Sequence, residues 1–250
     1  MRLKKPQPST VRPFMITVDF KRLPTQPGDR ILDIGCGSGR HSSAAYELKE
    51  VNVTGADIHF NDLKAAEERL RYHDELEAHG GGDWNLSVAD IENLPFKDRA
   101  FDMIICAEVM EHVPHDFQAA KELARVLKPG RRLAVSVPRY LPERFCWKLS
   151  QDYYRVDGGH IRIYKKSRLV SLFHAAGFTY RSSHFAHSLH TPYWWLKCLV
   201  GLNGDPITPV RLYQRFLNWD IMQKPKSTAR IDHLLNPLLG KSLVVYFDKK

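Results

Sequence analysis

The segment Arg30-Ile31-Leu32-Asp33-Ile34-Gly35-Cys36-Gly37-Ser38-Gly39 begins as a short apolar run and ends in three alternate glycines. Such apolar runs are typical of parallel strands that are buried on both faces. The glycines that follow predict a tight turn, and a helical stretch follows from about Arg40 to Leu48. This segment therefore predicts the first strand, turn and helix of an α/β fold.

The same alternation of strand and helix continues along the chain. Further strands are expected at residues 51–58, 84–90, 101–107 and 132–137, with helices at residues 61–78 and 117–127. Residues 139–166 have no clear period, and the pattern then predicts a helix at 167–176, a strand at 178–185 and a last strand at 242–247. Strands that alternate with helices in this way predict a parallel sheet covered on both faces.

Composition places the chain among ordinary globular proteins. It has 250 residues, of which 43% are hydrophobic and 26% charged, values that argue against a disordered or membrane-spanning class. Its net charge of +9 lies in the flanks, since residues 1–30 and residues 187–250 each carry +5 and the middle carries −1. Basic flanks of this kind can meet nucleic acid, an anionic membrane or an acidic substrate, or can simply be solvated.

We expect four regions: an irregular basic arm (1–29), a core (30–186), an insertion or lid (187–241) and the last strand of the core (242–250). The four cysteines are far apart and form no C-x-x-C pair, so neither a zinc ribbon nor a redox motif is indicated. Because no apolar stretch follows the charged N-terminus, we expect no secretory signal and a cytoplasmic location.

The glycine loop itself is compatible with two cofactors. Glycines after a first strand also bind the pyrophosphate of dinucleotides, but here the spacing is Gly35-x-Gly37-x-Gly39 and Asp33 lies two residues before the first glycine. A carboxylate in that place would repel a pyrophosphate and attract a ligand that carries an ammonium and a sulfonium. The loop therefore favours S-adenosylmethionine over NAD.

Two more acidic residues lie at the ends of later strands. Asp57 ends the second strand, where it can accept hydrogen bonds from ribose hydroxyls. Asp90 ends the third, where it can bind the adenine amino group while Ile91 covers the ring. Each could instead only cap the next helix, but together the acids fit one elongated ligand laid across the strand ends.

These motifs resemble those of the class I methyltransferases, especially the group of ubiquinone- and menaquinone-biosynthesis enzymes. The resemblance covers about residues 28–178 and implies a Rossmann-like sheet of order 3-2-1-4-5-7-6 with strand seven antiparallel. It also implies contacts with S-adenosyl-L-methionine at the matching positions, namely Asp33, Gly35, Gly37, Gly39, Asp57, Ile58, Asp90, Ile91 and Ala107.

Residues after the fourth strand are expected to face the methyl group. Here Glu108, Glu111 and His112 have the spacing of one side of a helical turn, and two carboxylates with an imidazole can bind a divalent cation. His160 could complete the site, as in metal-assisted relatives, the ubiquinone-pathway catechol O-methyltransferases and small-RNA methyltransferases. The alternatives are that His112 or His160 acts as a catalytic general base without metal, or that His112 only packs near the donor.

The insertion of residues 187–241 is not explained by the family pattern. Its run Thr191-Pro-Tyr-Trp-Trp-Leu-Lys-Cys-Leu-Val200 is too short to cross a bilayer, and could be a lid over an apolar acceptor, a patch on a membrane or a helix packed as core. His184, His187 and His190 recur every third residue and are expected to flank the acceptor cavity rather than to bind a metal.

Together these features predict a methyltransferase that modifies a small or lipid-like molecule at oxygen, with peripheral membrane contact as a further expectation. RNA methylation is an alternative that the basic flanks favour and the lack of a recognisable RNA-binding module disfavours. A non-catalytic scaffold that keeps the donor pocket is a second alternative.

Overall fold

The computed structural model describes residues 15–150, 153, 159–201 and 208–250. Its centre is a seven-stranded sheet of order β3-β2-β1-β4-β5-β7-β6, in which β7 runs antiparallel to both neighbours and the other pairs are parallel. The predicted order is therefore confirmed. In chain order the strands are β1 (Arg30–Ile34), β2 (Asn52–Asp57), β3 (Trp84–Val88), β4 (Phe101–Ala107), β5 (Leu127–Pro138), β6 (Phe178–Ala186) and β7 (Ser242–Lys249).

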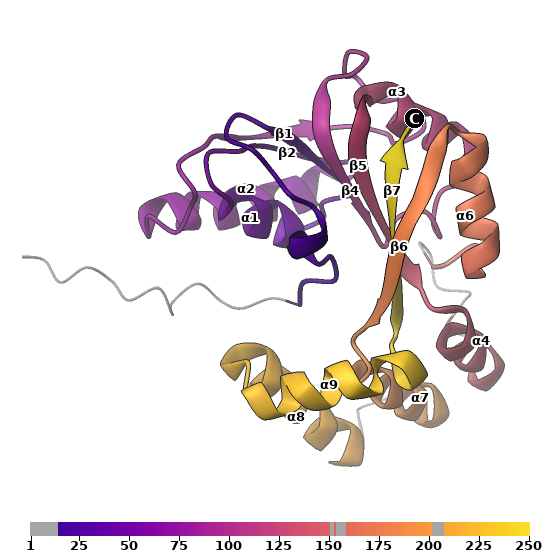
Figure 1. Ribbon diagram of the computed structural model, residues 1–250. Coiled ribbons are helices and arrows are strands. Elements are labelled where there is room, and N and C mark those ends of the chain that lie inside the picture. The colour runs from indigo at the N-terminus through magenta and orange to yellow at the C-terminus, as the bar shows by residue number, and fades with distance from the viewer. Residues whose placement is uncertain (1–14, 151–152, 154–158, 202–207) are drawn as a thin grey trace, which may run out of the picture.

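Helices cover both faces of the sheet and bury two separate apolar clusters (Figure 1). On one face lie α1 (Arg40–Tyr46) and α2 (Phe60–Glu75), and on the other α3 (Asp116–Val126) and α6 (Lys166–Ala175). Neighbouring strand residues point to opposite clusters, so Ile31 packs in the first and Leu32 in the second. This two-sided burial explains why the strands are continuous apolar runs in the sequence.

The part of the arm that the structure describes packs onto the sheet. Apart from a short 3-10 turn, η2 (Phe20–Arg22), it has little regular structure, but Val18 and Leu23 are buried in the α1–α2 cluster. The backbone N–H of Asp19 donates to the hydroxyl of Tyr246 on β7 at 2.8 Å. Residues 1–14 of the predicted arm lie outside the described residues.

A layer of helices lies beyond the carboxyl ends of the parallel strands, at the bottom of Figure 1. One of them, α4 (Tyr140–Leu149), occupies a segment for which no helix was predicted, and Pro142 stands in its first turn, where proline is tolerated. The insertion supplies the other three, α7 (His190–Val200), α8 (Thr208–Gln223) and α9 (Lys226–Leu239), while residues 202–207 lie outside the described residues. Among the described helices, none is long and apolar enough to span a bilayer.

The carbonyl groups at the end of α9 accept hydrogen bonds from two side chains, one in the core and one on α7. Arg139, which precedes α4, donates to the carbonyl oxygens of Asn236 and Pro237 at 3.3 and 2.9 Å. Thr191 on α7 donates its hydroxyl to the carbonyl oxygen of Leu239 at 2.6 Å. These bonds satisfy carbonyl groups that a helix end leaves without partners. The bonds from Arg139 join the insertion to the core, and the bond from Thr191 joins α7 to α9 within the insertion.

Candidate active site

The glycine loop joins β1 to α1 and needs glycine for steric reasons. All three glycines have positive φ, with +68° at Gly35, +53° at Gly37 and +77° at Gly39. A Cβ atom on Gly35 would also lie 2.2 Å from Cγ2 of Val109, in the segment after β4. The loop after β4 is therefore packed directly against the glycine loop, which brings the expected donor side and acceptor side together.

Asp57 at the end of β2 stabilises the conformation of the glycine loop. Its two carboxylate oxygens accept hydrogen bonds from the backbone N–H groups of Gly37, at 2.8 Å, and His59, at 2.9 Å. Each carboxylate oxygen has a second lone pair. Asp57 can therefore fix the loop and still accept a hydrogen bond from a ligand hydroxyl.

Asp33 is buried one residue before the end of β1, with only 1% of its surface exposed. Its Oδ2 accepts a hydrogen bond from the hydroxyl of Ser42 on α1 at 2.6 Å. Burial raises the pKa of this carboxyl from 3.8 to about 6, which the Ser42 hydroxyl and the nearby Arg40 only partly offset. At neutral pH the carboxylate is ionised, and its burial would strengthen its attraction to a cation.

The remaining positions expected to contact the donor differ in exposure. Ile58 is 58% exposed beside the loop, whereas Ile91 is 7% exposed and packs in the α3–α6 cluster. The Oδ1 of Asp90 accepts a hydrogen bond from the backbone N–H of Glu92, so this acid shapes its own turn. Ala107, the last residue of β4, is buried. Of the two isoleucines, Ile58 offers the accessible apolar surface.

The segment after β4 is a turn, so the expectation of a helical turn at Glu108, Glu111 and His112 is wrong. The cause is Glu108, whose φ of +58° places it in the left-handed region. Its backbone N–H and its Oε1 are both bonded to Ser136 on β5, at 2.9 and 2.8 Å. Glu108 is thereby bonded to the sheet and does not join Glu111 and His112 as a possible metal ligand, although its charge still acts on Glu111.

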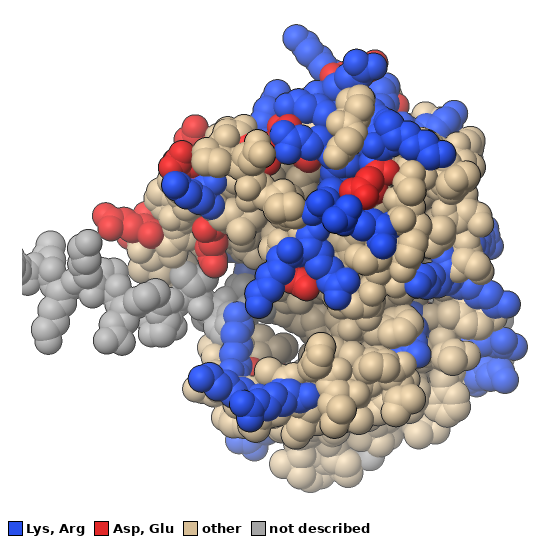
Figure 2. All heavy atoms as spheres, in the orientation of Figure 1, with Lys and Arg blue, Asp and Glu red and all other residues tan. Residues whose placement is uncertain are grey.

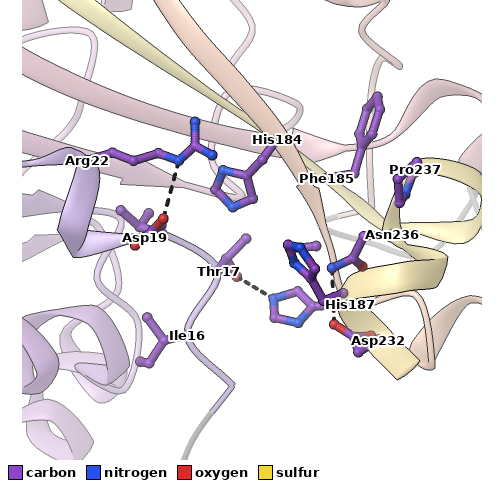
Figure 3. A pocket seen from close by; sticks show the side chains of 13 residues that line it. Ile16, Thr17, Asp19, Arg22, His184, Phe185, His187, Asp232, Asn236 and Pro237 are labelled. Atoms are coloured by element: carbon purple, nitrogen blue, oxygen red, sulfur yellow. Dashed lines mark hydrogen bonds and ion pairs between the residues drawn. The ribbon is translucent and has the colours of Figure 1, made fainter. Parts of the chain in front are cut away.

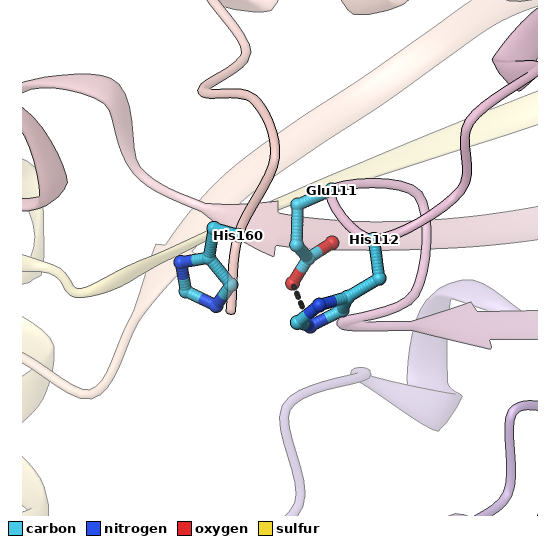
Figure 4. A group of neighbouring side chains, drawn as sticks. All are labelled: Glu111, His112 and His160. Carbon is cyan, nitrogen blue, oxygen red and sulfur yellow. Dashed lines mark ion pairs between the residues drawn. The ribbon is translucent and has the colours of Figure 1, made fainter. Parts of the chain in front are cut away.

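Glu111, His112 and His160 nevertheless come together, 49 residues apart along the chain at most (Figure 4). Each offers one possible ligand atom, and these atoms all lie within 4.8 Å of one another. Glu111 is 1% exposed, and within the described part of the chain no other residue donates a hydrogen bond to its carboxylate oxygens. Burial, reinforced by Glu108 and Glu143, raises the pKa of Glu111 well above its usual range.

Both histidine rings are oriented through Nδ1. The Nδ1 of His112 donates to the carbonyl oxygen of Gly159 at 3.2 Å, and the Nδ1 of His160 lies 2.5 Å from Oε1 of Glu143 on α4. Because a carbonyl or carboxylate oxygen can only accept, Nδ1 carries the proton in both rings and the lone pair is on Nε2. Histidines that bind metals or accept protons are commonly oriented in this way.

Glu143 was missed in the sequence because it lies in the segment that showed no period. It is 2% exposed, and it also accepts hydrogen bonds from the Nε1 of Trp147 and the hydroxyl of Tyr153, both at 3.2 Å. The available signal was Pro142, which can begin a helix, followed by the aromatic residues of 140–147. An acid on the inner face of that helix would then have required a partner.

A cavity of 480 Å³ opens between the arm, β6 and α9 (Figure 3), and its lining residues do not include Glu111, His112 or His160. His184 and His187 line it; the ring of His184 stacks on Tyr246, and the Nε2 of His187 lies 3.1 Å from the hydroxyl of Thr17. Burial lowers the pKa of both histidines, so both are neutral near pH 7. Among the described residues, Glu111, His112 and His160 form the one group of three possible metal ligands.

The tryptophans of α7 are half-buried against other helices. Trp195 donates its Nε1 to the carbonyl oxygen of Pro142 at 3.3 Å and contacts the ring of Phe145 on α4. Trp194 contacts the rings of Tyr153 and Tyr193. These contacts join α7 to α4, the helix that carries Glu143.

Comparison with known proteins agrees with this geometry. Residues 32–135 match a family model described as a methyltransferase domain. The chain thus has the fold of the class I methyltransferases. The 27-O-demethylrifamycin SV methyltransferase of Amycolatopsis mediterranei is 34% identical over 113 residues, which cover 45% of this chain and 40% of the relative. The ubiquinone/menaquinone C-methyltransferase UbiE of Ectopseudomonas mendocina is 37% identical over 114 residues, or 44% and 42% of the two chains.

The fold has relatives among solved structures as well. The [4+2]-cyclase SpnF superposes with a TM-score of 0.60 over 92% of this chain and 78% of that protein, at 21% identity. This likeness concerns the fold alone. The chain spans under half the length of the two curated relatives. The family model covers the strands expected to bind the donor and leaves out residues 187–241.

Proposed function

We propose that this methyltransferase transfers a methyl group from S-adenosylmethionine to an oxygen atom of a small or lipid-like acceptor. The observation that carries the proposal is the contact between Val109 and the glycine loop. Because Val109 lies two and three residues before Glu111 and His112, this contact supports a position of Glu111, His112 and His160 near the loop expected to hold the donor, at the edge of the sheet where ligands bind in such folds. The name of the rifamycin-related enzyme supports an oxygen acceptor.

The donor would lie across the ends of β1, β2 and β3. In this arrangement Asp33 attracts the ammonium group, Asp57 accepts hydrogen bonds from the ribose, and Ile58 covers the adenine ring. Asp90 would bind the adenine amino group, with Ile91 supporting it from the core. The buried site of Asp33 strengthens the attraction because charges interact more strongly where water is excluded.

Methyl transfer is an in-line displacement, so the acceptor oxygen attacks the methyl carbon while the bond from that carbon to sulfur breaks. The hydroxyl proton of the acceptor must leave, and we assign its removal to an imidazole Nε2 of His112 or His160. The sulfonium becomes a neutral thioether and the imidazole becomes an imidazolium. Glu143 stabilises that cation on His160 through the hydrogen bond to Nδ1.

Glu111, His112 and His160 also fit a divalent cation, because a buried carboxylate that no described neighbour donates to is joined by two Nε2 lone pairs. These three residues would hold the ion, and the ion would lower the pKa of a bound acceptor hydroxyl. Binding can be measured without turnover by titrating the protein with Mn²⁺ and following the paramagnetic relaxation of water. Loss of Mn²⁺ binding in Glu111→Gln, but not in Glu108→Gln, would support the site, and the absence of Mn²⁺ binding in the unaltered chain would exclude it.

The proposed reaction is tested by incubating the chain with S-adenosylmethionine carrying a ¹³C methyl group and a panel of phenolic, catecholic and aliphatic hydroxyl acceptors. NMR separates a new O-methyl carbon from a C-methyl carbon by chemical shift. A C-methyl product would contradict the oxygen assignment and keep the enzyme class. If calorimetry detects no binding of the donor, the enzymatic proposal fails and the scaffold alternative stands.

A further inference from the structure

The insertion exposes an unusual amount of apolar surface. On α8 the side chains of Leu212, Phe216, Trp219 and Met222 are between 36% and 58% exposed, and their spacing of four, three and three residues places them on one face. On α9 Ile231 is 48% exposed and Leu234 and Leu238 are each 75% exposed, and their spacing of three and four residues also places them on one face. We name these seven residues the apolar stripes. The described residues contain eighteen exposed large hydrophobic side chains, and half of them lie between Leu199 and Leu238.

The apolar stripes are not the side of the helix that packs in the protein, because α8 buries a different face. Val210 and Leu217 point to α7, where they pack with Tyr193. α9 is fixed through its carbonyl groups by Arg139 and Thr191. Both helices are therefore already seated on the protein, and the stripes are a second, outward surface. Exposed apolar faces on neighbouring helices, such as α8 and α9 in Figure 1, are typical of interaction sites in soluble proteins.

Exposed charges next to the stripes have a single sign. Arg211, Arg215 and Arg230 each directly precede a stripe residue, and Lys224 and Lys226 lie in the turn between the two helices and at the start of α9. The described acids of the two helices are half-buried, and the carboxylate of Asp232 is turned inward onto Ser188, Leu189 and Asn236. Figure 2 shows the corresponding lower lobe as mostly apolar or neutral with basic side chains at its left margin, while acidic side chains gather farther up on the left.

We propose that α8 and α9 form a docking surface for an anionic lipid bilayer. The apolar stripes would enter the boundary between headgroups and acyl chains, and the arginines and lysines would contact lipid phosphates, as amphipathic helices do at membrane interfaces. A second copy of the chain fits less well, since a two-fold contact would bring the same basic margins together. The inference does not depend on catalysis, although it would give a lipid-like acceptor a short path to the cavity that α9 lines.

The test uses the full chain and sedimentation with phosphatidylcholine vesicles, with and without phosphatidylglycerol. We expect binding that requires phosphatidylglycerol and weakens as salt is raised, because screening reduces attraction between exposed charges. Trp219→Ser and Leu234→Ser should each lower the partition coefficient about tenfold, since burial of one such side chain is worth at least about 1.4 kcal/mol. Arg211→Gln with Arg215→Gln should weaken binding to the anionic vesicles alone.

Phe117→Ser is the matched control, because Phe117 on α3 is 44% exposed and lies on a helix of the sheet core. Its partition coefficient should stay unchanged, and circular dichroism should show all variants folded, since the altered side chains are exposed. The proposal is overturned if the chain does not bind anionic vesicles, or if the stripe variants bind as the unaltered chain does. It is also overturned if the chain is a dimer in solution that the stripe variants convert to monomer. Donor binding by calorimetry, measured in parallel, shows independently whether the methyltransferase proposal holds.

Discussion

The proposed donor side and the proposed acceptor side of this chain are assembled in different ways. On the donor side, each group follows directly from the strand that carries it: the glycine loop from β1, Asp57 from β2 and Asp90 after β3. On the acceptor side, Glu111, Glu143 and His160 come from three separate segments and meet only because α4 and the chain before α6 fold back over β4. Local motifs therefore specify the donor side, while tertiary contacts specify the acceptor side.

The largest effect is expected where the two sides touch. Gly35→Ala would place a Cβ atom 2.2 Å from Cγ2 of Val109 at a backbone φ of +68°, so the loop must move. We expect the dissociation constant for S-adenosylmethionine to rise about a thousandfold, which corresponds to about 4 kcal/mol. Calorimetric titration with the donor measures it.

Gly130→Ala is the control for the backbone strain, because Gly130 has a φ of +71° and nothing within 4 Å of the added Cβ. That variant should bind the donor normally. Equal losses in both variants would show that strain, and not contact with the acceptor side, governs position 35.

The second effect concerns the acceptor side alone. His160→Ala should lower kcat about a hundredfold while donor affinity stays unchanged, because loss of a general base affects the chemical step. His115→Ala is the control, since His115 is an exposed residue of the loop between β4 and α3, where it pairs with Glu92. A loss of donor affinity in His160→Ala, without a change in kcat, would contradict the division between the two sides.

Most element boundaries could be predicted because the apolar runs and glycines are local signals, whereas the order of the strands was implied by the resemblance to the class I methyltransferases. Leu32 and Ile31 face opposite clusters, which makes the run continuous and easy to recognise. The geometry after β4 could not be predicted, because the left-handed φ of Glu108 depends on its bonds to Ser136 in another strand. The role of Glu143 could not be predicted for the same reason, because it depends on a contact with His160, which lies seventeen residues away along the chain.

A smaller effect, on stability, is expected when the tryptophans of α7 are replaced. It distinguishes a lid over the acceptor from a helix packed as core. Trp195→Ala should lower the free energy of unfolding by about 2 kcal/mol, because a half-buried ring and its bond to Pro142 are lost. Trp219→Ala, at an exposed ring of α8, should change it by less than about 0.5 kcal/mol. Chemical denaturation measures both, and a Trp195 variant of unchanged stability with weakened acceptor binding would favour the lid.

The smallest effect is a pH dependence that belongs to the donor side. The pKa of Asp33 is raised to about 6 in the folded chain, so the native state holds this proton more tightly than the unfolded chain does. Its contribution to stability is therefore favourable at low pH and is lost as pH rises through about 4 to 6. Donor affinity should change in the opposite sense, because only the ionised carboxylate attracts the ammonium group, and should fall up to about tenfold per pH unit below about pH 6.

His41 must be separated from this effect, because burial lowers its pKa to about 3 and it therefore favours the fold as pH rises. The difference between the unaltered chain and Asp33→Asn isolates Asp33, since His41 is present in both. The amide oxygen of the substituted side chain can still accept the hydrogen bond from Ser42, so the variant should remain folded and bind the donor weakly with little pH dependence. If the unaltered chain shows no loss of donor affinity below about pH 6 relative to this variant, the ionised form of Asp33 does not bind the donor, and the donor side depends on Asp57 and the glycine loop instead.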